Sequence, residues 1–362
     1  MNEDPRFLLV GTAKGLLVYA LRSQAKLTNV HFVGFSVNMI YVDPRINRWW
    51  VGVSHKHWGE KLHFSDDYGK TWQIAPSPSF EGALLPGGKP AKLRQIWCMH
   101  HGGLDRPGEL WLGTDPGGLF KSEDNGQTFR LVESLWNHPS RQNQTQWFGA
   151  GSDFPFIHSI VVNPKDPHHL YIAVSCAGVF ETVDGGNSWH PKNQGLVAAY
   201  LPNPNVEVGH DPHHLIMSPN DPSILWQQNH CGVFFTKDGG ENWQDVSNKE
   251  QLPYYGFAIA INEDIEGTAW VIPVESDEQR VAPDLRIRVL ETSDFGKSWQ
   301  SVSSGLPVEK FFGIVLRQAF ATKANHMVFG TTNGHLYYSI KSKVHWSLLT
   351  DHLTKVNSVF IS

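Results

Sequence analysis

Short apolar runs bounded by glycine or proline recur along the whole chain and predict β-strands. Examples are Leu110–Gly113, Leu170–Ala173 and Ile224–Gln227. Each run is too short for a helix of ordinary length, and a glycine-containing loop and a second apolar run follow it. The pattern therefore predicts an all-β chain made of many short strands.

An octad of the form S/T-x-D-x-G-x-S/T/N-W/F occurs five times at nearly constant spacing. Its third-position aspartates are Asp67, Asp124, Asp184, Asp238 and Asp294. An aspartate can accept hydrogen bonds from its own turn, a glycine two residues later permits positive φ, and the final aromatic residue supplies an apolar anchor. The octads therefore predict hairpin turns.

Counting these units gives seven repeats of about 50 residues. Units without an octad occur at both ends, because Phe7–Tyr19 and Met327–Tyr338 share one pattern. An additional strand, Val356–Ile361, is left over at the end of the chain. We expect it to complete the N-terminal blade of a single seven-bladed β-propeller over residues 1–362. Six blades are the alternative, because an insertion at Val271–Arg288 makes the repeat units there harder to count.

Composition narrows the functional class. The chain has 30 Lys+Arg against 35 Asp+Glu and no basic run, which argues against a nucleic-acid partner. No apolar run approaches a membrane span, and the first residues do not resemble a secretory signal. Three cysteines without paired spacing argue against a disulfide framework. We therefore expect a cytoplasmic protein with neither a nucleic-acid nor a membrane partner.

Histidines gather in one half of the chain, where 14 of the 19 lie between His55 and His230. Aligning the first strand of each blade places His158 and His213 at one position, which we expect at the mouth of the propeller channel. The loop between the second and third strands of another blade adds His230. We predict these three histidines as catalytic residues. A divalent metal held by them, a metal-free histidine pocket and solvated histidines without a role all stay open.

Three long loops, Gln73–Leu93, Arg130–Phe156 and His190–Pro212, are expected to raise one side of the same face. Trp136 and Trp147 in the second loop are also candidate anchors for a protein partner. The predicted substrate-binding residues from these loops and from the aligned strand ends are Asn38, His55, His57, Gln95, Asp115, Trp136, Arg141, Trp147, Glu207, His210 and His214.

The octads resemble the Asp-box, or BNR repeat, of sialidases, two-propeller xyloglucanases, sortilin-type receptors and a plant photosystem II assembly factor. The whole chain is similar to bacterial Asp-box propellers labelled WD40/YVTN/BNR-repeat or exo-α-sialidase-like proteins. The match is closest over Leu135–Arg141, Ile157–Ile160, Gly209–His214 and Leu225–Gly232. The resemblance implies octads at the outer edges of the blades, away from any active site, and it implies no established reaction.

Literal sialidase chemistry is not expected. The Arg-Ile-Pro element of that family is absent, since Arg6 is followed by Phe7-Leu8, and no set of three arginines is evident. The two-aspartate mechanism of xyloglucanases normally uses a cleft between two propellers, and this chain has room for one.

Two hypotheses remain. The first is a hydrolase-like or lyase-like enzyme that acts at the histidine-rich mouth on a carbohydrate or another polar small molecule, with or without a metal. The alternative is a non-catalytic propeller that binds a protein partner or assists assembly through its loop-rich face.

Overall fold

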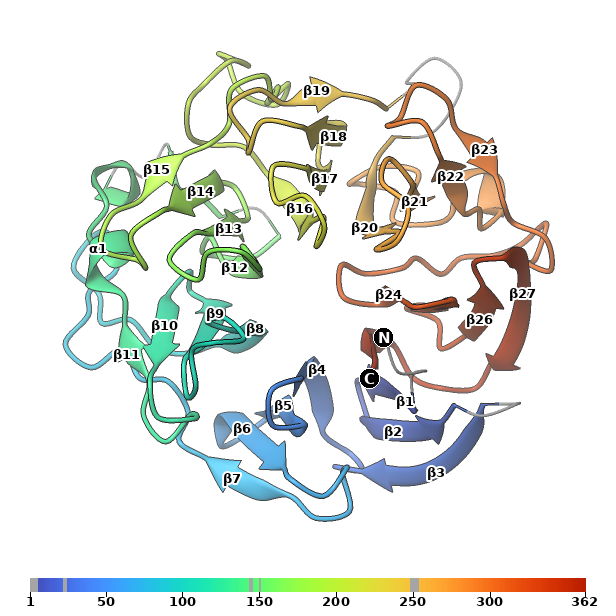
Figure 1. Ribbon diagram of the computed structural model, residues 1–362, viewed down its shortest axis with the longest axis horizontal. Coiled ribbons are helices and arrows are strands. Elements are labelled where there is room, and N and C mark those ends of the chain that lie inside the picture. The colour runs from blue at the N-terminus through green and yellow to red at the C-terminus, as the bar shows by residue number, and fades with distance from the viewer. Residues whose placement is uncertain (1–5, 22–24, 143–145, 150, 248–253) are drawn as a thin grey trace. The chain divides into compact units, whose positions relative to one another are not determined.

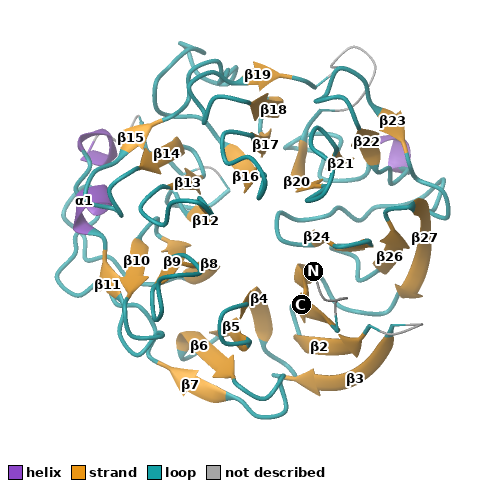
Figure 2. Ribbon diagram, in the orientation of Figure 1, coloured by secondary structure: helices purple, strands orange, loops and turns teal. Residues whose placement is uncertain are grey.

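Seven four-stranded sheets form the blades of an all-β propeller (Figures 1 and 2). This computed structural model describes residues 6–21, 25–142, 146–149, 151–247 and 254–362. Residues 1–5, which contribute to the prediction that no secretory signal is present, lie outside that range. Seven sheets confirm the predicted blade number, and the six-blade alternative is wrong.

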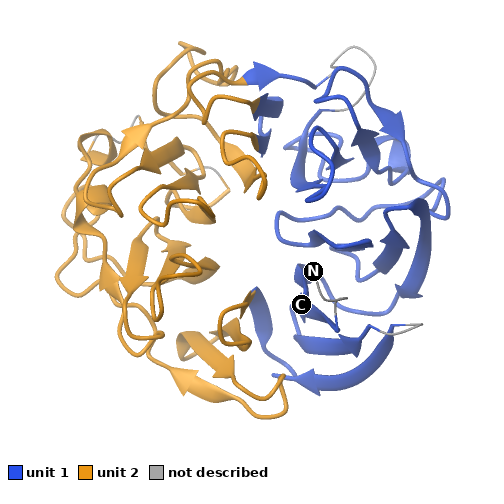
Figure 3. Ribbon diagram, viewed as in Figure 1, with its two compact units in different colours: residues 1–40, 226–235, 244–362 blue, residues 41–225, 236–243 orange. Residues whose placement is uncertain are grey.

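The chain divides into two compact units, which are described separately (Figure 3). Unit 1 comprises residues 1–40, 226–235 and 244–362, and unit 2 comprises residues 41–225 and 236–243. The single domain over residues 1–362 stays a prediction.

The two ends of the chain share one sheet in unit 1. Its strand order is β28 (Val356–Ile361), β1 (Phe7–Thr12), β2 (Gly15–Ala20) and β3 (Lys26–His31). β1 pairs antiparallel with β28 from Leu8 opposite Ile361 to Thr12 opposite Val356, and the N and C labels lie side by side in Figure 1. The predicted completion of the N-terminal blade by the last strand is confirmed.

The other six sheets each take their four strands in chain order. Their bounds are β4 Ser36–Asp43, β5 Arg48–His55, β6 Gly59–Ser65 and β7 Gln73–Ala75; β8 Gln95–His101, β9 Leu110–Asp115, β10 Leu119–Ser122 and β11 Arg130–Leu131; β12 Ile157–Val162, β13 Leu170–Val174, β14 Gly178–Thr182 and β15 His190–Pro191; β16 Pro212–Met217, β17 Leu225–Asn229, β18 Gly232–Thr236 and β19 Gln244–Asp245; β20 Gly256–Ile261, β21 Ala269–Pro273, β22 Leu290–Thr292 and β23 Gln300–Ser301; β24 Phe320–Lys323, β25 His326–Gly330, β26 Leu336–Ile340 and β27 Lys343–Thr350.

Helical structure among the described residues is confined to loops. The α-helix α1 (Glu133–Trp136) and the 3-10 helix η1 (Pro139–Gln142) lie between β11 and β12. The 3-10 helix η2 (Pro283–Leu285) lies in the insertion between β21 and β22, so this insertion lengthens one blade and does not change their number. No helix in the described ranges is long and apolar enough to span a bilayer.

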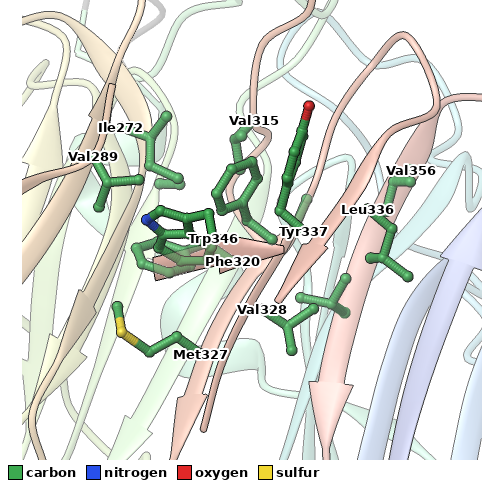
Figure 4. Close-up of a cluster of buried hydrophobic side chains, with 14 of the residues drawn as sticks. Ile272, Val289, Val315, Phe320, Met327, Val328, Leu336, Tyr337, Trp346 and Val356 are labelled. Carbon is green, nitrogen blue, oxygen red and sulfur yellow. The ribbon is translucent and has the colours of Figure 1, made fainter. Parts of the chain in front are cut away.

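The largest described core of unit 1 packs apolar side chains between its sheets (Figure 4). Trp346, Phe320 and Phe329 lie close together, with ring centroids 4.7 Å apart for Phe329 and Trp346. Successive strand residues point to opposite faces, and both faces of an inner strand are covered. For this reason β25 is buried along almost its whole length rather than at alternate positions.

All five octads form the same hydrogen-bonded turn. In the third copy, Thr182 Oγ1 donates to Asp184 Oδ1 at 2.7 Å and accepts the N–H of Gly186 at 3.0 Å. Asp184 also accepts the N–H of Ser188 at 2.9 Å and its hydroxyl at 2.6 Å. These bonds lower the pKa of the Asp184 carboxyl to about 2. The carboxylates of Asp67, Asp124, Asp238 and Asp294 make equivalent bonds, which supports a structural role.

Two of the octads, those that end in Trp243 and Trp299, bond to the preceding blade through the indole, and Trp346 in β27 does the same. The indole Nε1 of Trp243 donates to Lys192 O at 2.8 Å, Trp299 Nε1 donates to Val246 O at 2.7 Å, and Trp346 Nε1 donates to Val302 O at 2.9 Å. Each accepting carbonyl follows directly after the outermost strand of its blade. Trp189 differs, because its Nε1 has no hydrogen-bond partner among the described residues.

We predict that Trp243→Phe lowers the free energy of unfolding by about 1–3 kcal/mol, because it leaves the Lys192 carbonyl without its donor. Trp189→Phe is the matched control, since both indoles are 4 % exposed and only that of Trp243 donates. Urea unfolding of both variants measures the difference. Equal losses of stability would show that the indole bond contributes nothing beyond packing.

A second prediction concerns pH. Burial acts to raise the pKa of the Glu181 carboxyl, but hydrogen bonds from His169 and Lys192 outweigh it and lower the pKa to about 2. Its stabilising contribution is therefore complete above about pH 4.5 and is lost as the pH falls from 4.5 towards 2. We expect Glu181→Gln to lose less unfolding free energy than the parent across that window. Glu81→Gln, a change at an exposed side chain, should follow the parent curve.

Candidate functional site

His158 is held on both sides at the start of β12. Its Nε2 lies 2.8 Å from Pro212 O, so this nitrogen carries the proton. Its Nδ1 lies 2.9 Å from Ser159 Oγ, which already accepts the N–H of Leu215 and therefore donates its own hydroxyl proton to the ring. These bonds fix a neutral tautomer. Both ring nitrogens of His158 thus have partners within the protein and link β12 to the start of β16, and the catalytic and metal-binding roles of His158 stay predictions.

Asp211 and His213 form the centre of a buried polar cluster in unit 2. His213 Nε2 lies 3.3 Å from Asp211 Oδ2, and the two residues are 2 % and 6 % exposed. Asp211 Oδ1 accepts the hydroxyl of Ser175 at 2.9 Å and the N–H of Cys176 at 3.1 Å. Cys176 has a φ of 56°, an uncommon conformation for a non-glycine residue. Three donors thus stabilise the Asp211 carboxylate away from water.

His230 lies in unit 1, in the turn between β17 and β18. Its Nε2 is 3.7 Å from Asp277 Oδ2, and its ring meets Tyr255 edge-on at 5.2 Å. Asp211, His213 and His230 each offer one atom of a type that binds metal ions. A metal-ligand role for His213 in unit 2 and for His230 in unit 1 stays a prediction.

Asn38 and Asn357, which the strand alignment placed at equivalent positions, bond to each other in unit 1. Asn357 Nδ2 lies 3.1 Å from Asn38 Oδ1, and Ser36 Oγ donates to the same oxygen at 2.7 Å. The amide of Asn38 thus links two first strands.

The predicted rim residues Trp136, Arg141 and Trp147 come together, but they are buried. The guanidinium carbon of Arg141 lies 3.7 Å from the ring centre of Trp136 and 5.0 Å from that of Trp147, and Nη1 donates to Gly117 O at 2.6 Å. Burial lowers the pKa of the Arg141 guanidinium to about 9. The hypothesis that the two tryptophans are exposed anchors for a protein partner is wrong, because both pack inside their loop.

Polar residues of unit 2 also lie at the strand ends of two neighbouring blades, β4–β7 and β8–β11. His55 stacks on His63 with ring centroids 6.4 Å apart, and His57 is exposed in the following turn. Gln95 lies opposite Asp115 across β8 and β9. Asp115 accepts the hydroxyl of Ser152 at 2.8 Å, and burial raises the pKa of its carboxyl.

The third long loop places its predicted residues in three different settings. His210 is fully buried, its Nε2 donates to Val206 O at 2.7 Å, and burial lowers its pKa. His214 is half-buried in β16. Glu207 is exposed at the edge of a cavity of about 390 Å³. Cys98, Cys176 and Cys231 form no disulfide, as their spacing predicted.

Three polar residues that make buried contacts in these clusters were not predicted from the sequence. Asp211 and Ser175 complete the cluster around His213. Glu60 is a buried carboxylate that accepts a short hydrogen bond from Ser54, and burial raises its pKa. Only Asp211 carried a signal, since it stands two residues before His213 in the Gly209–His214 segment. The other two depend on contacts that the linear spacing does not indicate.

Comparison with curated proteins finds xyloglucanases. The chain is 29 % identical over 266 residues to an oligoxyloglucan-reducing end-specific xyloglucanase from Emericella nidulans, which covers 66 % of this chain and 30 % of that protein. Xyloglucanase Xgh74A from Acetivibrio thermocellus is 22 % identical over 232 residues, covering 56 % of this chain and 26 % of that protein. The chain thus spans under a third of the length of the curated relatives it matches.

A solved structure with a similar fold is YCF48 bound to D1 peptide, with a TM-score of 0.53 and 14 % identity over 93 % of this chain and 90 % of that one. This likeness concerns the fold alone. A family model described as sortilin, neurotensin receptor 3, matches residues 117–348, which is more than half of the chain. By this match the chain belongs to the Sortilin-Vps10 family.

Proposed function

We propose that this chain is a carbohydrate-active enzyme, hydrolase-like or lyase-like, whose reactive site is centred on His213. The buried hydrogen bond between Asp211 and His213 carries the proposal. The similarity to xyloglucanases supports a carbohydrate substrate. The narrower resemblance to exo-α-sialidase-like proteins stays a prediction, and we do not propose sialidase activity.

The contact between Asp211 and His213 suits general base catalysis. A carboxylate that accepts the imidazole N–H fixes the orientation of the ring and stabilises its protonated form. Ser175 and the Cys176 N–H in turn hold the Asp211 carboxylate in place. The imidazole can then remove a proton from an attacking water molecule, or from a sugar carbon in an elimination.

Substrate binding is proposed for the remaining polar residues at the strand ends. His55, His57, Gln95 and Asp115 lie in unit 2 on neighbouring blades, and their donors and acceptors suit sugar hydroxyl groups. His230 keeps its proposed catalytic role in unit 1, beside Asp277.

A metal-assisted form of the mechanism uses the same residues. Asp211 and His213 offer one oxygen and one nitrogen atom in unit 2, and His230 offers a nitrogen atom in unit 1; both donor types suit divalent transition metals. A metal held by Asp211 and His213 would act as a Lewis acid on a substrate oxygen. In the metal-free form, His213 and Asp211 act alone.

Protein binding is the second candidate function. The family description names a receptor, and YCF48, which has a similar fold, was solved with a peptide. Because Trp136 and Trp147 are buried, such a partner would contact other parts of the loop-rich face.

Release of reducing sugars from xyloglucan oligosaccharides tests the enzyme proposal. We predict that His213→Ala and Asp211→Asn each lower kcat by at least about 100-fold, because one removes the base and the other its carboxylate partner. Asp211→Asn should also shift the acid limb of the kcat/KM profile to lower pH, since an imidazolium without its carboxylate loses its proton more readily. His352→Ala, at an exposed site, should behave as the parent. Parental rates in the His213 variant would refute the assignment.

Metal analysis distinguishes the two forms of the mechanism. The metal-assisted form predicts a near-stoichiometric divalent metal in tag-free protein, its loss in His213→Ala, and inactivation by a chelator. The metal-free form predicts no bound metal after growth in supplemented medium and activity that the chelator leaves unchanged. The metal content of His158→Ala tests whether His158, both of whose nitrogens are hydrogen-bonded within the protein, contributes to metal binding.

A further inference from the structure

A cavity of about 390 Å³ lies in unit 2, on the outer side of the blade formed by β12–β15. It is lined by residues 190–197, 205–207 and 240–241. The first segment begins with β15, the outermost strand of its sheet, and the last belongs to the octad turn of residues 236–243. A cavity of this size accommodates a small ligand.

The walls of the cavity are fixed by bonds within the protein. The buried side chain of Asn193 accepts the N–H of Val179 at 2.8 Å and donates to Glu207 O at 2.9 Å. Trp243 donates its indole N–H to Lys192 O and its backbone N–H to Gln194 O, both at 2.8 Å. The cavity is therefore formed before any ligand binds, and a ligand need not order these segments.

Several polar side chains on the lining remain available. Within the described ranges, the side chains of His190, Gln194, Asn205 and Glu207 make no hydrogen bond or ion pair, and all four residues are exposed. Two primary amides, an imidazole and a carboxylate supply both donors and acceptors. Pro191 and Val197 add apolar surface beside them.

The charge of the cavity selects against anions. Lys192 is its one lysine, and that ammonium group is already paired with Glu181 at 3.2 Å and with Glu241. Glu207 adds a further carboxylate, so negative charge prevails at the cavity. An anionic sugar would face these carboxylates without a free cation to compensate.

From this combination we infer that the cavity is a binding subsite for a neutral sugar unit of an oligosaccharide. Hydroxyl groups of the sugar bond to the amides and to the Glu207 carboxylate, and its C–H face contacts Pro191 and Val197. The inference rests on the proposed function for its ligand class, but it uses none of the residues assigned to catalysis. Glu207, which was predicted to bind substrate, would thus bind a sugar at a site separate from the proposed catalytic residues.

Binding measurements on the full chain test this subsite. The probes are cellotetraose as the neutral oligosaccharide and 3′-sialyllactose as the acidic one. Backbone amide exchange locates binding at residues 190–197 and 205–207. We expect cellotetraose to slow exchange there, and 3′-sialyllactose to leave it unchanged.

The double variant Asn205→Ala/Glu207→Ala removes two available side chains without breaking a side-chain bond in the described protein. It should raise the Kd for cellotetraose at this site at least about tenfold and abolish the exchange protection. Glu81→Ala, another exposed glutamate outside the cavity, should bind as the parent. Unchanged protection in the double variant, or equal binding of both probes, would overturn the inference.

The outcome is independent of the proposed function. Protection that the double variant abolishes, in a protein that cleaves no oligosaccharide, would support the subsite and count against the enzyme. Cleavage that depends on His213, without protection of the cavity segments, would overturn the subsite and leave the enzyme proposal intact.

Discussion

Hydrogen bonds from a tryptophan indole to the preceding blade are the constraint that fixes the outer edges of three blades of this fold. Trp243, Trp299 and Trp346 each donate to a carbonyl that directly follows an outermost strand. These outer strands are short, and β15, β19 and β23 have two residues each. Such strands contribute few ladder bonds of their own, so the indole of the next blade fixes where each of them ends.

The bonds of Trp243 also fix the start of the loop that leads from β15 to Asp211 and His213. Trp243 fixes residues 192–194 at the beginning of that loop, and Asn193 holds Glu207 further along it. His210 then bonds back to Val206, and Asp211 and His213 follow directly. One anchored loop therefore forms both the outer cavity and the approach to the buried Asp211–His213 pair. The structural octad and the proposed chemistry are linked by continuous chain.

The repeated parts of the fold could be predicted from sequence because the same residue types recur at the same positions of each octad. The side chains of an octad make the hydrogen bonds of their own turn. The strand Val356–Ile361, left over when the repeats are counted, pairs with β1 in the N-terminal blade. The site could be predicted only in part. His158 and His213 occupy equivalent positions in their strands, yet His158 bonds to Ser159 and Pro212, whereas His213 lies against the Asp211 carboxylate. Likewise, the burial of Trp136 depends on its stacking with Arg141, which loop composition does not reveal.

The pairing of β1 with β28 has a consequence for the order of folding. Leu8 can pair with Ile361 only after the residues between them, which form the other six blades, have been synthesised. Until then the inner edge of the N-terminal blade has no partner strand, while the intervening sheets contain only strands that are nearer in sequence. During synthesis, blades can therefore assemble in sequence from the second onward. The blade that contains β1 is completed after the other six, and until then its unpaired edge is where the nascent chain needs protection from its neighbours.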